Sequence, residues 1–259
     1  MGKVYLVGAG PGSADLLTLR AFRLIQAADV ILFDALVGSE VLQLASSNAR
    51  LINVGKRSGR KSFSQEDINA LLIYAARSAE VVVRLKGGDP MVFGRAAEEM
   101  AALREQFIEF EIVPGVTAAC SAAAAAKVSL TDRRIASEVS FLTAQACDEN
   151  TGKQWIEPSE KNRTLVIYMP GQDYERLSSD LLRAGISATT PCVVVSKISS
   201  ADQQLLRTNV GSLALATPLA APAVIIVGEV AKSAEDAIAV DLERFGTQEV
   251  RSHVAYSAR

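Results

Sequence analysis

The sequence is poor in the residues that build metal centres and nucleophile sites. Its 259 residues include a single histidine, His253, and three widely spaced cysteines, Cys120, Cys147 and Cys192. One histidine excludes most zinc sites and a Ser-His-Asp triad, and this cysteine spacing provides neither a disulfide framework nor CxxC ligand pairs. We therefore predict no bound metal and a reducing, cytoplasmic location.

Strong net charge and membrane-length apolar runs are also lacking. The formal net charge is −2, and no apolar run approaches the length that spans a bilayer. These features predict binding to neither nucleic acid nor membrane, so an anionic ligand would have to meet a local basic patch. The composition is 49% hydrophobic and 22% charged, which is typical of a globular protein with a sizeable core.

Short β-branched runs alternate with helical patterns, as in βαβ units on a parallel sheet. Strands are expected at Val4–Val7, Val30–Phe33, Leu51–Val54, Val81–Leu85, Val139–Thr143, Thr164–Met169, Cys192–Val195, Leu205–Val210 and Ala223–Glu229. Helices are expected at Leu16–Ala27, Ser39–Ala45, Ala96–Arg104, Ala118–Ala126 and Tyr174–Ala184, with another beginning at Ser64. We predict an α/β fold with two domains, residues 1–114 and 115–245, followed by a tail over 246–259. The second domain is expected to hold a mixed sheet.

The sharpest motif is Gly8-Ala9-Gly10-Pro11-Gly12, which follows the first strand and permits a tight turn and close ligand approach. Asp34 ends the second strand, where an acid could bind a ribose hydroxyl in a dinucleotide-binding protein. The pattern departs from that fingerprint because Ser13 replaces the third glycine and Pro11 lacks an N–H. Asp15 adds negative charge where a phosphate would sit. An NAD-dependent oxidoreductase is therefore the weaker alternative.

Two further loops follow strands of the same predicted sheet. The segment Gly55-Lys56-Arg57-Ser58-Gly59-Arg60-Lys61 carries four cations, and Lys86-Gly87-Gly88-Asp89-Pro90 combines backbone freedom with charge. Taken alone, the first could be a solvated turn and Asp89 a helix-capping acid. Because ligands gather at the carboxyl ends of strands in open α/β sheets, we expect both loops to converge with Asp34 and the first glycine loop. The resulting crevice would suit a polyanion.

Read together, these segments resemble the tetrapyrrole methylase family, and most closely its uroporphyrinogen-III C-methyltransferases. The resemblance runs from Val4 to about Val230. Its seven ordered motifs are Val4-Tyr5-Leu6-Val7-Gly8-Ala9-Gly10-Pro11-Gly12, Ala28-Asp29-Val30-Ile31-Leu32-Phe33-Asp34, Val54-Gly55-Lys56-Arg57, Val83-Arg84-Leu85-Lys86-Gly87-Gly88-Asp89-Pro90, Phe93-Gly94-Arg95, Val113-Pro114-Gly115-Val116-Thr117-Ala118 and Val227-Gly228-Glu229.

The resemblance implies a homodimer of chains whose two α/β domains surround a cleft. It also implies transfer of methyl groups from S-adenosylmethionine to C2 and C7 of uroporphyrinogen III, giving S-adenosylhomocysteine and precorrin-2, a precursor of sirohaem and cobalamin. The matching donor contacts are Pro11, Gly87, Gly88, Asp89, Val92, Thr117, Ala118 and Met169.

The catalytic positions also follow from the resemblance. Asp34 matches a proton acceptor and Lys56 a proton donor, whereas Arg95 and Glu98 match a pair that binds substrate and removes the ring proton. The residues themselves leave open whether Asp34 or Glu98 is the base, because both assignments depend on the geometry of the folded cleft.

Several positions depart from the family pattern. Asp132 and Gln145 stand where relatives carry histidines, Ala96-Ala97 replaces two glycines, and Ile198 replaces a glycine of a donor-contact loop. A C-methyltransferase of a later precorrin is the nearest alternative, and a non-catalytic tetrapyrrole or nucleotide carrier is a more distant one. The length leaves no room for an added dehydrogenase and ferrochelatase module, so we expect methyl transfer only.

Overall fold

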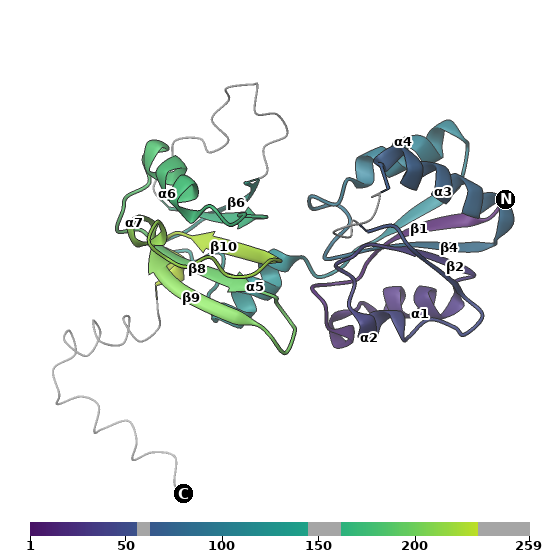
Figure 1. The fold of residues 1–259 in the computed structure, drawn as a ribbon, viewed down its shortest axis with the longest axis horizontal. Helices are drawn as coiled ribbons and strands as arrows, with labels where there is room; N and C mark the ends of the chain where they lie inside the picture. The colour runs from purple at the N-terminus through teal and green to yellow at the C-terminus, as the bar shows by residue number, and fades with distance from the viewer. Residues whose placement is uncertain (56–62, 145–161, 233–259) are drawn as a thin grey trace, which may run out of the picture.

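The chain folds around two five-stranded sheets, shown in a computed structural model (Figure 1). The structure describes residues 1–55, 63–144 and 162–232. Lys56 and the rest of the basic loop, Gln145 and the predicted tail over 246–259 therefore lie outside the described residues. Among the described helices, none is long and apolar enough to cross a membrane.

The first sheet is entirely parallel, with the strand order β3-β2-β4-β1-β5. Its strands are β1 (Lys3–Gly8), β2 (Val30–Phe33), β3 (Arg50–Asn53), β4 (Val81–Lys86) and β5 (Phe110–Val113). Helices α1 (Leu19–Ala27) and α2 (Ser39–Leu42) lie on one side, and α3 (Gln65–Ser78) and α4 (Ala96–Glu105) on the other (Figure 1). Val82 packs under α3 and α4, whereas Val83 faces α1, so both faces of the sheet are buried.

The second sheet is mixed, with the strand order β6-β7-β10-β8-β9. Its strands are β6 (Glu138–Thr143), β7 (Arg163–Tyr168), β8 (Pro191–Ser196), β9 (Gln204–Asn209) and β10 (Ala223–Val227). Only β6 and β7 pair in parallel. Helix α5 (Ala118–Ala126) covers one face, and α6 (Tyr174–Arg183) and α7 (Val210–Leu213) cover the other. The predicted α/β class, with one parallel and one mixed sheet, is confirmed.

The helix after the first glycine loop begins later than predicted. A short 3-10 turn at Ala14–Leu16 comes first, and α1 begins at Leu19, with the Thr18 hydroxyl accepting the Ala21 N–H at 3.1 Å. The prediction of a helix from Leu16 was therefore wrong, because Leu17 is extended and Thr18 caps the helix. The glycine loop does not run directly into a helix N-terminus, which removes the anion site of a dinucleotide-binding fold.

Other element ends differ by a few residues. The helix predicted at Ser39–Ala45 ends at Leu42, and the last strand ends at Val227 rather than Glu229. Gly228 explains the second difference, because its φ of 142° takes the chain out of strand geometry.

Candidate functional site

Three loops meet at the carboxyl ends of β1, β4 and β5. Gly10 and Gly88 form a two-way bridge, with the Gly88 N–H donating to the Gly10 carbonyl at 2.7 Å and the Gly10 N–H donating to the Gly88 carbonyl at 3.1 Å. A Cβ added at Gly8 would lie 2.6 Å from the Gly115 backbone, so only glycine fits there. The predicted convergence is confirmed for the loops after β1 and β4, and the loop after β5 joins them. The basic loop, which was predicted to converge there too, lies outside the described residues.

A cavity of about 810 Å³, including solvent at its mouth, opens beside these loops. All the residues predicted to contact the donor line it, namely Pro11, Gly87, Gly88, Asp89, Val92, Thr117, Ala118 and Met169. Residues that the sequence analysis did not assign to the site line it too, among them Leu36, Phe93, Tyr168 and Val224. Phe93 belongs to one of the seven motifs, whereas Leu36, Tyr168 and Val224 lie in none of them, so only the folded chain reveals that these three line the cavity.

Asp89 ties two of the loops together. Its Oδ2 accepts the Gly115 N–H at 2.9 Å and its Oδ1 accepts the Met91 N–H at 2.8 Å. The bond from Met91 is the local capping contact expected of an acid in this position. The bond from Gly115 joins the loop after β4 to the loop after β5. Asp89 therefore shapes the cavity wall in addition to lining it.

Tyr168 anchors the start of α5 at the cavity. Its hydroxyl lies 2.6 Å from the Thr117 Oγ1 and accepts the Ala119 N–H at 3.2 Å. Burial raises the pKa of Tyr168, so the phenol stays neutral and can take part in both bonds. The position of Thr117 and the first turn of α5 thus depends on a strand of the second sheet.

Aromatic rings form one side of the cavity and the surface beside it. The Phe93 ring centroid lies 4.9 Å from that of Tyr168, and the Phe141 centroid lies 5.7 Å from that of Tyr168. Phe93 and Met169 both adopt left-handed backbone conformations, with φ of 52° and 51°, and both side chains are about two-fifths exposed. The cavity therefore opens next to exposed apolar surface, which is suited to an apolar ring system.

The cavity fits the methyl donor that the resemblance implies. A Cβ at Gly87 would lie 3.0 Å from the Leu36 Cβ, so the wall there consists of backbone with little space for a side chain. Apolar walls with a few convergent polar groups, here around Asp89 and Thr117, are the usual lining of a nucleoside-sized site. The residues that line the cavity fit S-adenosylmethionine.

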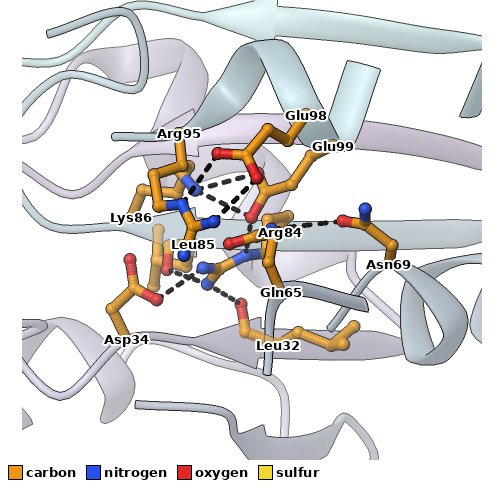
Figure 2. A network of polar contacts seen from close by, with 10 residues as sticks. All are labelled: Leu32, Asp34, Gln65, Asn69, Arg84, Leu85, Lys86, Arg95, Glu98 and Glu99. Carbon is orange, nitrogen blue, oxygen red and sulfur yellow. Dashed lines mark hydrogen bonds and ion pairs between the residues drawn. The ribbon is translucent and has the colours of Figure 1, made fainter. Parts of the chain in front are cut away.

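The structure places Asp34 at the edge of the first sheet and places Arg95 and Glu98 at the start of α4 (Figure 2). Asp34 follows β2, and its Oδ1 lies 2.5 Å from the Arg84 Nη2. Arg95 and Glu98 form an exposed fork-to-fork pair with two contacts of 2.7 Å. Their hydrogen bonds raise the pKa of Arg95 and lower that of Glu98, so both are charged at neutral pH. Lys56 lies outside the described residues.

Between Asp34 and this exposed pair lies a buried cluster that the sequence analysis missed (Figure 2). Glu99 accepts from the Arg84 Nε at 2.9 Å and from the Lys86 Nζ at 2.8 Å. Burial opposes the Arg84 charge, but Asp34 and Glu99 together raise the pKa of Arg84. Burial and the Arg84 charge lower the pKa of Lys86, against the attraction of Glu99. The sequence did contain a signal for this cluster, because Arg84 and Lys86 place two cations on the otherwise apolar strand β4.

The positions that depart from the family pattern lie in different surroundings. Asp132 pairs with Arg134 through contacts of 3.0 and 2.7 Å, and this pairing lowers the pKa of Asp132 to about 2. Ile198 lines the cavity with a nearly buried side chain, and Ala96 begins α4 in the core. Ile198 is therefore the departure that reaches the predicted donor site directly.

Comparison with known proteins agrees with this geometry. The Tetrapyrrole (Corrin/Porphyrin) Methylases family matches residues 3–214. A siroheme synthase of Psychrobacter sp. (strain PRwf-1) is 44% identical over 237 residues, which cover 90% of this chain and 48% of that protein. A siroheme synthase of Zymomonas mobilis is 42% identical over 230 residues, covering 88% and 49%. The chain spans about half the length of the curated relatives it matches.

Solved structures of tetrapyrrole methyltransferases are also similar to this chain, and the similarity covers nearly the whole length of each solved chain. Uroporphyrin III C-methyl transferase from Thermus thermophilus is 37% identical with a TM-score of 0.77, covering 88% of this chain and 98% of that chain, and its complex with S-adenyl homocysteine matches equally well. A cobalt precorrin-4 methyltransferase is 28% identical, also with a TM-score of 0.77, covering 89% and 96%. The chain therefore belongs to the tetrapyrrole methylase family.

Proposed function

We propose that the chain is an S-adenosylmethionine-dependent C-methyltransferase that converts uroporphyrinogen III to precorrin-2 by methylation at C2 and C7. The observation that carries this proposal is the gathering of every predicted donor residue on one cavity that opens beside exposed apolar rings. The Thermus thermophilus uroporphyrin III C-methyl transferase, which was crystallised with S-adenyl homocysteine, supports it.

The bound donor would supply a methyl group already activated on a sulfonium. The chain's own task at that end of the site is alignment. Pro11, Gly87 and Gly88 provide close-packed backbone, and Thr117 is held in place by Tyr168. Fixing two reactants in a near-attack arrangement can account for a large share of a rate enhancement, so no metal is required for this chemistry.

Substrate binding and proton removal would use the charged residues around the cleft. Arg95 is exposed and offers a guanidinium to the substrate's carboxylates, and Lys56 and its loop would add further cations. Both Glu98 oxygens accept from Arg95, whereas within the described part of the chain Arg84 contacts only Oδ1 of Asp34. Oδ2 of Asp34 is therefore the better placed oxygen to accept the ring proton, and we assign Asp34 as the base.

Anaerobic incubation of the purified protein with uroporphyrinogen III and S-adenosylmethionine tests this function. Mass spectrometry counts the methyl groups gained, and a reaction without donor is the control. Two methyl groups are expected. No transfer, combined with clear binding of S-adenosylhomocysteine, would overturn the substrate assignment in favour of a later precorrin. Absence of both transfer and binding would overturn the methyltransferase itself.

We also propose a cytoplasmic homodimer whose subunits each contain two domains, residues 1–114 and 115–245. The end of β5 at Val113, followed by packing of α5 on the second sheet, supports this boundary. Light scattering after gel filtration is expected to give twice the 27.5 kDa chain mass. Limited proteolysis is expected to release a fragment that ends near residue 114, whereas first cuts inside either sheet would contradict the boundary.

A further inference from the structure

Two cations lie on the central strand of the parallel sheet. Strand β4 sits between β2 and β1, and its residues Val82, Arg84 and Lys86 face the layer that contains α3 and α4. Arg84 and Lys86 are each only 2% exposed. Charges in such a position lose most of their hydration, which is costly unless partners compensate for it.

Glu99 on α4 is the partner that the two cations share. It is fully buried, and its Oε1 accepts from both the Arg84 Nε and the Lys86 Nζ, while its Oε2 also accepts from Lys86. One carboxylate balances only one of the two positive charges. The second compensating carboxylate is that of Asp34, which Arg84 contacts through Nη2 (Figure 2).

The Arg84 guanidinium is held from several directions. Its Nη1 donates to the Leu85 carbonyl at 3.2 Å and to the Leu32 carbonyl at 3.5 Å, and its Nε donates to Glu99. The planar fork therefore has a single orientation, and Nη2 can point only toward Asp34. Asp34 is the most exposed member of this chain of contacts, with 30% of its side chain accessible, so it is the point at which the buried network reaches solvent, two residues before the cavity-lining Leu36.

A gain in stability alone does not explain this network of buried charges. Buried ion pairs often stabilise a fold no more than well-packed apolar residues of the same volume would. The central strands of the second sheet carry such residues at buried positions, for example Val193, Val195 and Ile226. The ionic arrangement in the first sheet therefore calls for another explanation than packing.

We infer that Arg84 and Glu99 are positioning residues: Glu99 fixes the Arg84 guanidinium, and Arg84 holds the Asp34 carboxylate in place at the end of β2, beside the cavity-lining Leu36. This inference rests on the proposed function, in which Asp34 removes the ring proton. Supporting groups that fix a reacting side chain can affect rates strongly, because small misplacements of reacting atoms slow a reaction by up to about 100-fold.

A double-mutant cycle tests the inference in the full chain. Glu99→Gln is expected to lower kcat for uroporphyrinogen III methylation by about 10- to 100-fold, while KM and the Kd for S-adenosylhomocysteine change less than about twofold. In the Asp34→Asn background the same substitution is expected to change kcat less than about twofold, because the group it positions is gone. Equal effects in both backgrounds would overturn the inference.

Leu103→Ala is the matched control for loss of stability. Leu103 is also fully buried on α4, one turn after Glu99, but its side chain belongs to the apolar core. Leu103→Ala is expected to lower the Tm and to keep the native kcat at temperatures where the variant is folded. Arg84→Lys is the second test variant, since it keeps the charge but lacks the fork, and it is expected to lose kcat like Glu99→Gln. A kcat in Arg84→Lys equal to that of the native protein would show that the positive charge alone matters and would overturn the positioning role.

A crystal structure of the Glu99→Gln or Arg84→Lys variant provides a readout that does not depend on activity. The Asp34 carboxylate is expected to leave the position it has in the native chain, and an unchanged carboxylate would overturn the inference. If the native protein transfers no methyl group to uroporphyrinogen III, the proposed function fails, whereas the position of Asp34 in the variants still decides whether Arg84 and Glu99 place it.

Discussion

The two sheets solve the same packing problem in different ways. Both are covered by helices on both faces, yet the first carries Arg84 and Lys86 on its central strand, whereas the second has only apolar side chains at the buried middle of β8 and β10. The first sheet supplies charged groups and glycine loops to the site, and the second supplies an apolar wall. One site can therefore draw its charge and its apolar surface from separately packed layers.

Strand direction explains how each sheet reaches the cavity. All strands of the first sheet run the same way, so the loops after β1, β4 and β5 meet at one edge. In the second sheet β10 runs antiparallel to β7, which places Val224 opposite Tyr168. The end of one strand and the start of another therefore meet at the wall of the cavity.

The largest expected effect comes from removing the charge at the edge of the first sheet. Asp34→Asn is expected to lower the rate of methyl transfer by about 100- to 10,000-fold, the range typical of a lost general base. The Kd for S-adenosylhomocysteine, measured by calorimetry, is expected to stay within about twofold of the native value, because Asp34 does not line the donor cavity.

Asp29→Asn is the matched control for that substitution. Asp29 lies at the opposite end of β2, where its Oδ2 accepts the N–H groups of Glu80 and Val81. Its variant is expected to retain methyl transfer. A similar loss of rate in both variants would mean that the charge of the sheet as a whole matters and that Asp34 has no special role.

A substitution in the core of the second sheet is expected to lower stability and to leave donor binding nearly unchanged. Ile225→Ala removes a fully buried side chain that faces α6, and it should lower the free energy of unfolding by about 2–5 kcal/mol. Urea denaturation measures this loss. The Kd for S-adenosylhomocysteine should change little in the folded variant, because Ile225 points away from the cavity.

Val224, the neighbour of Ile225 on β10, serves as the matched control. Val224 lines the cavity, so Val224→Ala should weaken donor binding with a smaller loss of stability than Ile225→Ala. Weaker donor binding in Ile225→Ala than in Val224→Ala would contradict the assignment of one β10 face to the core and the other to the site.

The two described cysteines differ in exposure, and a smaller effect is expected from this difference. Burial in the second sheet raises the pKa of Cys192 to about 12, whereas Cys120 is exposed. In the native protein near pH 8, a thiol reagent is expected to modify Cys120 and to leave Cys192 unmodified, as mass spectrometry of peptides would show. The unfolded chain loses the Cys192 proton near its ordinary pKa of 9.0, so the free energy of unfolding should fall as the pH rises from there toward 12. Rapid modification of Cys192 at pH 8 would contradict its burial.

The smallest effect is expected at an exposed pair beside β6. Arg134→Gln should raise the pKa of Asp132 from about 2 toward the ordinary 3.8, because the Arg134 side chain is the strongest cause of the shift. The return should be partial, since the Arg134 backbone N–H still donates to Asp132. Carboxyl NMR titration measures both values. The pairing favours the folded state above pH 3.8 and is lost as the pH falls through 2. An Asp132 that titrates alike in both proteins would show that the pair does not form in solution.

Local patterns were sufficient for much of the fold. The alternation of β-branched runs with helical segments predicted the α/β class, and the Ser64 cap predicted the start of α3, where its hydroxyl accepts the Asp67 N–H. The glycine loops predicted where the site would form. Element ends were less certain, and the start of α1 was wrong because the Thr18 cap outweighs the apolar pattern that extends back to Leu16.

The element types, the glycine loops at the strand ends and the motifs of the family could all be read from local sequence. The charge pairs could not, because Glu99 lies 15 residues and Asp34 lies 50 residues from Arg84 along the chain, and folding brings them together. The same holds for Tyr168, whose bond to Thr117 joins positions 51 residues apart. Local propensity acts over a few residues, whereas the buried network and the cavity wall depend on the packing of distant segments, which no single motif specifies.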